Sequence, residues 1–311
     1  MNNNNDIVSE IERLKREKNA VILGHYYQDP SIQNVCYIIG DSLALAQKAI
    51  KVEADIILMC GVKFMGETVK ILNPTKKVLV PDLNAGCSLA DSCRASDLAE
   101  MKKKYPDHTV VSYVNTSAEV KALTDVVVTS SNALSIIEQF PKDEKILFCP
   151  DKNLGGFINK LTGRNMLLWD GACHVHEGFS LDFIKNVKSI YKDAEIICHP
   201  ECKSEIVDIC DYAGSTASMI DYVGKSESNL FIVVTESGIL FELQKRYPEK
   251  TFIPAPPVSE RGSRNTCEYM RLNSLEKVYE TLKNESPEIV IEKELSERAK
   301  VCIDRMLTMT K

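Results

Sequence analysis

Short apolar runs alternate with longer amphipathic segments along most of the chain. An amphipathic segment near Ile7 to Lys18 precedes the run NAVILGHYYQD, and ADIILMCGV and KKVLVPDLNAGC contain the next two apolar runs. Helix-like sequence separates them, in LALAQKAIKV after Asp41 and Ser42, and in FMGETVKILNP, which ends at Pro74. Apolar runs of this length, bounded by turn residues, are typical of buried parallel strands. Their alternation with helices predicts an α/β fold with parallel sheets.

The same order of strand and helix signals returns twice, which indicates a triplicated chain. HTVVSYVNTSAEVKAL repeats the first strand and helix, DVVVTSSNALSIIEQFP repeats DIILMCGVKFMGETVKILNP, and EKILFCPDKNLGG repeats KKVLVPDLNAGC. The third copy contains AEIICHPECKSEIVDI, NLFIVVTESGILFELQKRYP and KTFIPAPP, with an expected insertion around DYAGSTASMIDYVGKSES. This periodicity predicts three lobes of three strands each, over residues 1–105, 106–192 and 193–311, the last including the C-terminal amphipathic segments as packing helices.

Composition and charge restrict the class of partner. Hydrophobic residues make up 44% of the chain and charged residues 26%, as in ordinary globular proteins. The net charge of -6 argues against binding to nucleic acid or to an anionic membrane, because both require a basic surface. The sequence contains no apolar run of the roughly 18 to 20 residues that a membrane span needs, and no stretch typical of a signal peptide. We therefore expect a cytoplasmic protein.

The cysteines are numerous for a reducing compartment. There are eleven, an odd number that cannot pair fully, so thiols are expected. Most are expected to be small buried apolar residues, but three of them follow the last apolar run of each copy in turn-rich loops: Cys87 in DLNAGCSLAD, Cys173 in WDGACHVHE and Cys267 in GSRNTCEYM. Three lobes around one axis would bring these thiols together. Three thiolates suit a 4Fe-4S cluster that keeps one open iron, which would act as a Lewis acid.

Polar pairs stand at the end of the first strand of each copy. They are His25 and Tyr27, Tyr113 and Asn115, and His199 and Glu201. The i, i+2 spacing places both members of a pair on the same side of an extended segment. A second layer of hydroxyls stands at expected helix starts, in Asp41-Ser42, Thr129-Ser130-Ser131 and Gly214-Ser215-Thr216. Such residues either cap the helices or hold an anion together with backbone N–H groups, and both interpretations remain open.

Other interpretations of the chemistry are weaker. Zinc ligands could come from Cys198, His199 and Cys202, or from Cys173 with His174 and His176, but neither set has the usual C-x2-C arrangement. The sequence has no GxGxxG motif, and its Gly-Lys-Ser triplet lacks the preceding glycine of a P-loop. An iron-sulfur redox sensor without turnover is a further alternative, but an electron carrier needs neither an open iron nor converging His, Tyr, Glu and Ser groups.

The motifs taken together resemble those of the quinolinate synthase family over nearly the full length. GHYYQ, GDSL, CGVKFMGETVKIL, VPDLNAGCSLAD, YVNT, TSSNA, PDKNLG, WDGACHVHE, HPEC and GST occur in the order found in that family. The resemblance implies three similar α/β lobes around a central 4Fe-4S cluster whose ligands would be Cys87, Cys173 and Cys267. It also implies an enzyme of NAD biosynthesis that condenses iminoaspartate with dihydroxyacetone phosphate to quinolinate, phosphate and water.

The resemblance also implies roles for the polar residues. Tyr27, His199 and Glu201 would be catalytic groups that move protons, and His199 and Glu201 would also contact substrate. Carboxylates or the phosphate would be held by His25, Ser42, Tyr113, Asn115, Ser130 and Thr216. Because iminoaspartate is unstable, transient contact with an aspartate-oxidising enzyme is expected as well, although no residue of the sequence indicates it.

Overall fold

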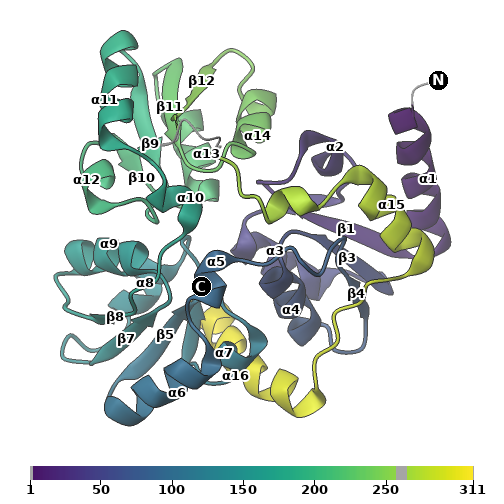
Figure 1. Cartoon of the computed structure of the whole chain (residues 1–311), viewed down its shortest axis with the longest axis horizontal. Helices are drawn as coiled ribbons and strands as arrows, with labels where there is room; N and C mark the ends of the chain where they lie inside the picture. Colours follow the sequence, from purple (N-terminus) through teal and green to yellow (C-terminus); the bar gives the residue numbers. More distant parts are fainter. Residues whose placement is uncertain (1–2, 257–264, 311) are drawn as a thin grey trace.

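The computed structural model describes residues 3–256 and 265–310, so residues 257–264 and 311 of the expected third lobe lie outside the described residues. Within this part of the chain, three four-stranded sheets form, each entirely parallel. Figure 1 shows them as three α/β units arranged around a common centre. The predicted fold class, three α/β lobes with parallel sheets, is confirmed.

The elements follow one another in the same order in each lobe. The first lobe contains α1 (Asn3–Glu17), β1 (Ala20–His25), α2 (Pro30–Gln33), β2 (Ile38–Gly40), α3 (Ser42–Lys51), β3 (Ile56–Cys60), α4 (Lys63–Leu72), β4 (Lys77–Leu79), α5 (Ser88–Asp91) and α6 (Ala95–Lys104). The second contains β5 (Thr109–Tyr113), α7 (Ala118–Lys121), β6 (Val126–Val128), α8 (Ala133–Glu138), β7 (Ile146–Cys149), α9 (Lys152–Thr162), β8 (Leu167–Leu168), α10 (His174–Glu177) and α11 (Leu181–Ile190). The third contains β9 (Glu195–Cys198), α12 (Ser204–Val207), β10 (Tyr212–Ala213), α13 (Thr216–Lys225), β11 (Leu230–Val234), α14 (Ile239–Arg246) and β12 (Thr251–Pro254), and the chain continues through η1 (Met270–Leu272), α15 (Leu275–Asn284) and α16 (Lys293–Met309).

The strand order corrects the repeat alignment made from the sequence. The orders are β2-β1-β3-β4, β6-β5-β7-β8 and β10-β9-β11-β12, so each lobe has four strands rather than three. The strands missed in the sequence are β2, β8 and β10, which have only two or three residues and are mostly part-buried, so they lack the marked apolar run of the other strands. DVVVT is consequently the counterpart of β2, not of β3, and the expected insertion in the third lobe is β10 with α13.

The strands form because they are apolar on both faces. Every residue of β3 is buried, as is every residue of β7. Such runs suit sheets covered by helices on both sides. Polar side chains mark several helix starts: Asp41 accepts a hydrogen bond from the backbone N–H of Ala44 at α3, and Asp151 accepts one from Leu154 at α9.

The C-terminal helices pack away from the third sheet. Helix α15 buries Leu275, Val278 and Leu282 against apolar residues of α1 in the first lobe. Helix α16 buries Ala299, Cys302, Ile303 and Met306 in a core that the first two lobes share. Figure 1 shows α16 lying beside α7 of the second lobe and α4 of the first. Both C-terminal segments are thus helices that pack on the first two lobes. None of the helices in the described ranges combines the length and apolarity that crossing a membrane demands.

Candidate active site

The carboxyl ends of the first strands of the three sheets open onto one shared cavity. Ligands of parallel sheets bind at this end of the strands. All twelve site residues expected from the sequence line it: His25, Tyr27, Ser42, Cys87, Tyr113, Asn115, Ser130, Cys173, His199, Glu201, Thr216 and Cys267. Residues that are far apart in the chain are therefore brought together at one place by the threefold arrangement.

The three cysteines occupy corresponding positions in the lobes. Cys87 immediately precedes α5, Cys173 immediately precedes α10, and Cys267 lies just before η1. Burial raises the pKa of the Cys87 thiol to about 12, that of Cys267 to about 11, and that of Cys173 well above its usual range. All three cysteines line the same cavity.

This donor set fits an iron-sulfur cluster. None of the described residues lining the cavity is a lysine or an arginine, so no basic side chain in the lining stabilises the thiolates. A metal centre that displaces the protons supplies that stabilisation, and thiolate ligands are those that iron-sulfur clusters use.

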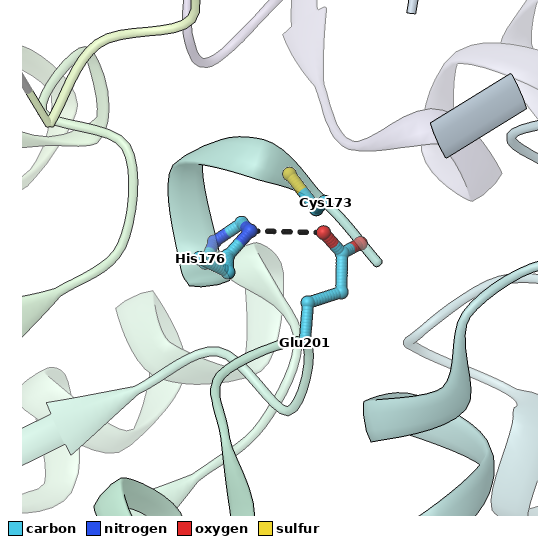
Figure 2. Close-up of side chains that lie close together, drawn as sticks. All are labelled: Cys173, His176 and Glu201. Atoms are coloured by element: carbon cyan, nitrogen blue, oxygen red, sulfur yellow. Dashed lines mark ion pairs between the residues drawn. The ribbon is translucent and has the colours of Figure 1, made fainter. Parts of the chain in front are cut away.

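A second set of donors in the cavity could hold a single metal ion. Among the described residues, one group of three metal-ligating side chains has its donor atoms within 4.8 Å of one another, formed by Cys173, His176 and Glu201 (Figure 2). Of the two zinc sets considered from the sequence, that of Cys198, His199 and Cys202 is wrong. Cys198 and Cys202 lie in the apolar core of the third lobe, whereas the imidazole of His199 points toward Ser130.

Two strand ends fold into the same turn. The backbone N–H of Tyr27 donates to Nδ1 of His25 at 3.1 Å, and that of Glu201 donates to Nδ1 of His199 at 3.3 Å. Burial lowers the pKa of His25 to about 4 and that of His199 to about 3. Both imidazoles are therefore neutral at pH 7, and since Nδ1 accepts, the proton of each ring stands on Nε2, where it is available as a donor.

Glu201 is the centre of a buried polar cluster. The Tyr113 hydroxyl donates to its Oε1 at 2.6 Å, and Nδ1 of His176 lies 2.9 Å from its Oε2 (Figure 2). Burial raises the pKa of this carboxyl, but His199, His176 and the Tyr113 hydroxyl more than reverse that effect and hold it below its usual range. Burial also raises the pKa of Tyr113. At neutral pH the pair is thus a carboxylate and a protonated phenol.

The hydroxyl layer lies across from these groups. Tyr27 Oη is 3.0 Å from Thr216 Oγ1 and 2.9 Å from Thr235 Oγ1, and burial raises its pKa. The side-chain caps of α3 and α13 are Asp41 and Ser215, not Ser42 and Thr216. The capping interpretation is therefore confirmed for Asp41 and Ser215, whereas Ser42 and Thr216 stand at the first helical position and line the cavity.

The sequence did not predict the contacts of two cavity residues, His176 and Glu236. His176, considered there only as an extra zinc ligand, contacts Glu201 and places Nε2 2.9 Å from Thr235 Oγ1. Glu236 lies two residues after β11 and was not considered at all; burial raises its pKa to about 7. The sequence could have indicated His176 through its spacing from Cys173. It lies in the first turn of the helix that Cys173 precedes, so both side chains stand at the same end of that helix.

A cavity that joins three thiols, a buried carboxylate, neutral imidazoles and phenols has the composition of an enzyme active site. A family model described as "Quinolinate synthetase A protein" matches residues 9–308, and the chain belongs to this family. It is similar to the quinolinate synthase of Chloroherpeton thalassium, with 52% identity over 98% of this chain and 95% of the relative. The quinolinate synthase of Thermosynechococcus vestitus is 51% identical over 98% and 96% of the two chains, and that of Synechocystis sp. 50% identical over 98% and 96%. The protein is thus an enzyme, and these matches support quinolinate synthase function.

Proposed function

We propose that the protein condenses iminoaspartate with dihydroxyacetone phosphate to quinolinate, phosphate and water, and that Cys87, Cys173 and Cys267 hold a 4Fe-4S cluster. The observation that carries the proposal is the convergence of one cysteine loop and one polar strand end from each lobe on a single cavity. When bound, a cluster with three cysteine ligands supplies an open iron that acts as a Lewis acid toward carboxylate or hydroxyl oxygens.

Proton transfer is assigned to the buried cluster around Glu201. Its carboxyl is ionised at neutral pH and is therefore the group that accepts a proton from substrate carbon or nitrogen. Tyr27 stays protonated and donates to a carbonyl or leaving oxygen, with its hydroxyl oriented by Thr216. Neutral His199 donates a hydrogen bond from Nε2 and keeps its proton, so it adds no charge beside the base.

Binding of the two anionic substrates is assigned to short-range donors. His25 offers an Nε2–H group, and Tyr113 and Asn115 offer polar groups from the end of the second sheet. Ser42 and Thr216 stand at the starts of the ten-residue helices α3 and α13, where backbone N–H groups and the helix dipole favour negative charge. Ser130, which is 3.2 Å from His199 Nε2, completes the set.

Anaerobic purification with metal and sulfide analysis tests the proposed cofactor. We expect about four irons and about four acid-labile sulfides per chain, with quinolinate formed from the two proposed substrates. Cys87→Ala, Cys173→Ala and Cys267→Ala should each lose the cluster and the activity. Full iron content in one of them would remove that residue from the ligand set.

Two cysteines outside the cavity provide matched controls. Cys93 and Cys302 are each at most 1% exposed and are absent from the cavity lining, so Cys93→Ala and Cys302→Ala should keep the full iron content. Zinc without sulfide in the wild-type protein would refute the proposal and favour a single metal ion at Cys173, His176 and Glu201. A cluster without quinolinate formation would favour the redox-sensor alternative.

A further inference from the structure

We propose that Glu236 is a positioning residue whose buried carboxylate anchors the loop that carries Cys267 and thereby sets the place of the third cluster ligand. The proposal deepens the proposed function and rests on it for the identity of the cluster. Glu236 is 1% exposed and lies at the edge of the cavity, two residues after β11. Its position at a strand end fixes its backbone independently of the cysteine loop.

The carboxylate is bonded on both oxygens. Oε1 accepts the backbone N–H of Cys267 at 3.1 Å and the Nη2 group of Arg271 at 3.1 Å. Oε2 accepts the backbone N–H of Gly238 at 2.6 Å. A buried carboxylate that accepts three hydrogen bonds restrains all three donors, because a donor that moved away would be left buried without a partner. With both oxygens so engaged, Glu236 is suited to hold the site rather than to exchange protons with a substrate.

The anchored loop is tied to the same strand end at other points. The backbone N–H of Ser237 donates to the carbonyl of Asn265 at 2.7 Å, and that of Arg271 donates to the carbonyl of Cys267 at 3.1 Å. The backbone of Cys267 is therefore held at its N–H by Glu236 and at its carbonyl by Arg271. Its thiol is only part-buried and packs at the edge of two apolar clusters.

The same network reaches the first lobe. The guanidinium of Arg271 extends past Glu236 and places Nη1 3.9 Å from Asp29 Oδ2. Gly238, the third partner of Glu236, packs so closely on Tyr27 that a Cβ there would lie 2.6 Å from the Tyr27 Cα. Glu236 therefore holds both the Cys267 loop and Gly238, which contacts the Tyr27 backbone. This fixes the position of the Cys267 thiol relative to the polar end of the first sheet.

Thiol alkylation of the full chain without metal measures the anchor directly. The wild type, Glu236→Ala and Glu236→Gln are treated anaerobically with iodoacetamide, and the modification rates of Cys267 and Cys87 are followed by peptide mass spectrometry. In Glu236→Ala we expect the Cys267 rate to rise about tenfold and the Cys87 rate to change less than about twofold. An unchanged Cys267 rate would overturn the proposal.

The glutamine variant separates anchoring from charge. Loss of the negative charge by itself favours the Cys267 thiolate and speeds alkylation in both variants equally. Glutamine keeps an oxygen that accepts from Cys267 and Arg271, so the Cys267 rate should rise at most about threefold in Glu236→Gln. Equal rates in the two variants would assign the effect to charge and overturn the anchor.

Glu242 provides a control for general loosening of the third lobe. It is 7% exposed in α14 and accepts a hydrogen bond from Nε of Arg246 at 2.6 Å, and among the described residues none of its hydrogen bonds or ion pairs reaches a cysteine loop. Glu242→Ala should leave the Cys267 rate within about twofold of the wild type. The same tenfold rise in Glu242→Ala would refute a specific role of Glu236.

Iron release from the loaded protein gives the second measurement. With a chelator present, Glu236→Ala should lose iron about ten times faster than the wild type and Glu242→Ala should not, followed by absorbance. Equal release rates in Glu236→Ala and the wild type would contradict the positioning of a ligand. If the wild-type protein holds no iron and sulfide, the proposed function fails, and the alkylation rates still decide whether Glu236 anchors the loop.

Discussion

Replacing Lys121 by methionine should change the pH dependence of stability, because Lys121 is a buried cation. It ends α7 and is 0% exposed. Its ammonium donates to the carbonyl of Val114 at 2.9 Å and to that of Thr116, and it lies 5.5 Å from the centre of the Phe64 ring. Among the described residues, no carboxylate oxygen lies within ion-pair distance of it. Lys121 therefore supports the loop that carries Asn115 while keeping a charge away from water.

The magnitude follows from the pKa. Burial lowers the pKa of Lys121 from 10.5 to about 8, and charged or titratable groups on the elements around it oppose this only partly: Glu67, Cys302, Glu119 and Cys87. Between these two pH values the unfolded chain holds a proton that the folded chain has lost, so the free energy of unfolding rises with pH. A difference of about 2.5 units corresponds to about 3 kcal/mol.

Urea unfolding followed by circular dichroism, from pH 7.5 to 10.5, measures this effect. The quantity of interest is the wild-type free energy of unfolding minus that of Lys121→Met, in which the titrations of groups common to both chains largely cancel. We expect this difference to rise by about 3 kcal/mol in favour of the wild type across the range. A difference that stays constant, or that falls with pH, would show that Lys121 is not a buried ammonium and would refute the reasoning.

Two further predictions concern carboxyl groups. Glu201→Gln should keep its iron and lose quinolinate formation by at least about 100-fold, because the amide cannot accept the proton; a rate within about threefold of the wild type in an anaerobic turnover assay would exclude Glu201 from the mechanism. Glu285 is only part-buried, and hydrogen bonds from Lys18 and Lys77 lower its pKa to about 2. Its stabilisation is present above about pH 4.5 and lost as the pH falls toward 2. Glu285→Gln should therefore lower the free energy of unfolding by about 0.5–1 kcal/mol at pH 7 and by nearly nothing at pH 2, with equal losses at both contradicting the ion-pair account.

The site could be predicted from the sequence largely because the chain repeats. A single His or Tyr at a strand end carries little information, but the pairs beginning at His25, Tyr113 and His199 stand 88 and 86 residues apart. Equivalent strands of similar lobes end at equivalent places in the fold. Polar pairs at equal spacing along the chain are therefore expected to meet at one site between the lobes. The three cysteine loops followed from the same reasoning, and all of these residues line one cavity.

Glu236 was missed because of the error in the strand alignment. Short strands such as β8, with two residues, have too few apolar positions to be detected and are stabilised by the neighbouring strand instead. Once β3, β7 and β11 are aligned as counterparts, their second following residues are Val62, Asp151 and Glu236. Buried carboxylates thus recur at equivalent positions in two lobes, a pattern that the alignment with three strands per lobe concealed.

The composition of the cavity limits how an acidic protein could hold the anionic substrates that we propose. The described lining contains Asp41, Glu201 and Glu236 but no lysine or arginine, so a long-range positive field from the lining is absent. Attraction is therefore assigned to groups that act at contact distance: the open iron of the proposed cluster, hydroxyls, neutral imidazole N–H groups and the helix starts at Ser42 and Thr216. Such donors are screened little by salt, unlike a basic patch. The Michaelis constants of the proposed substrates should therefore depend only weakly on ionic strength, because the groups that bind them lie inside the cavity and not in a charged surface patch.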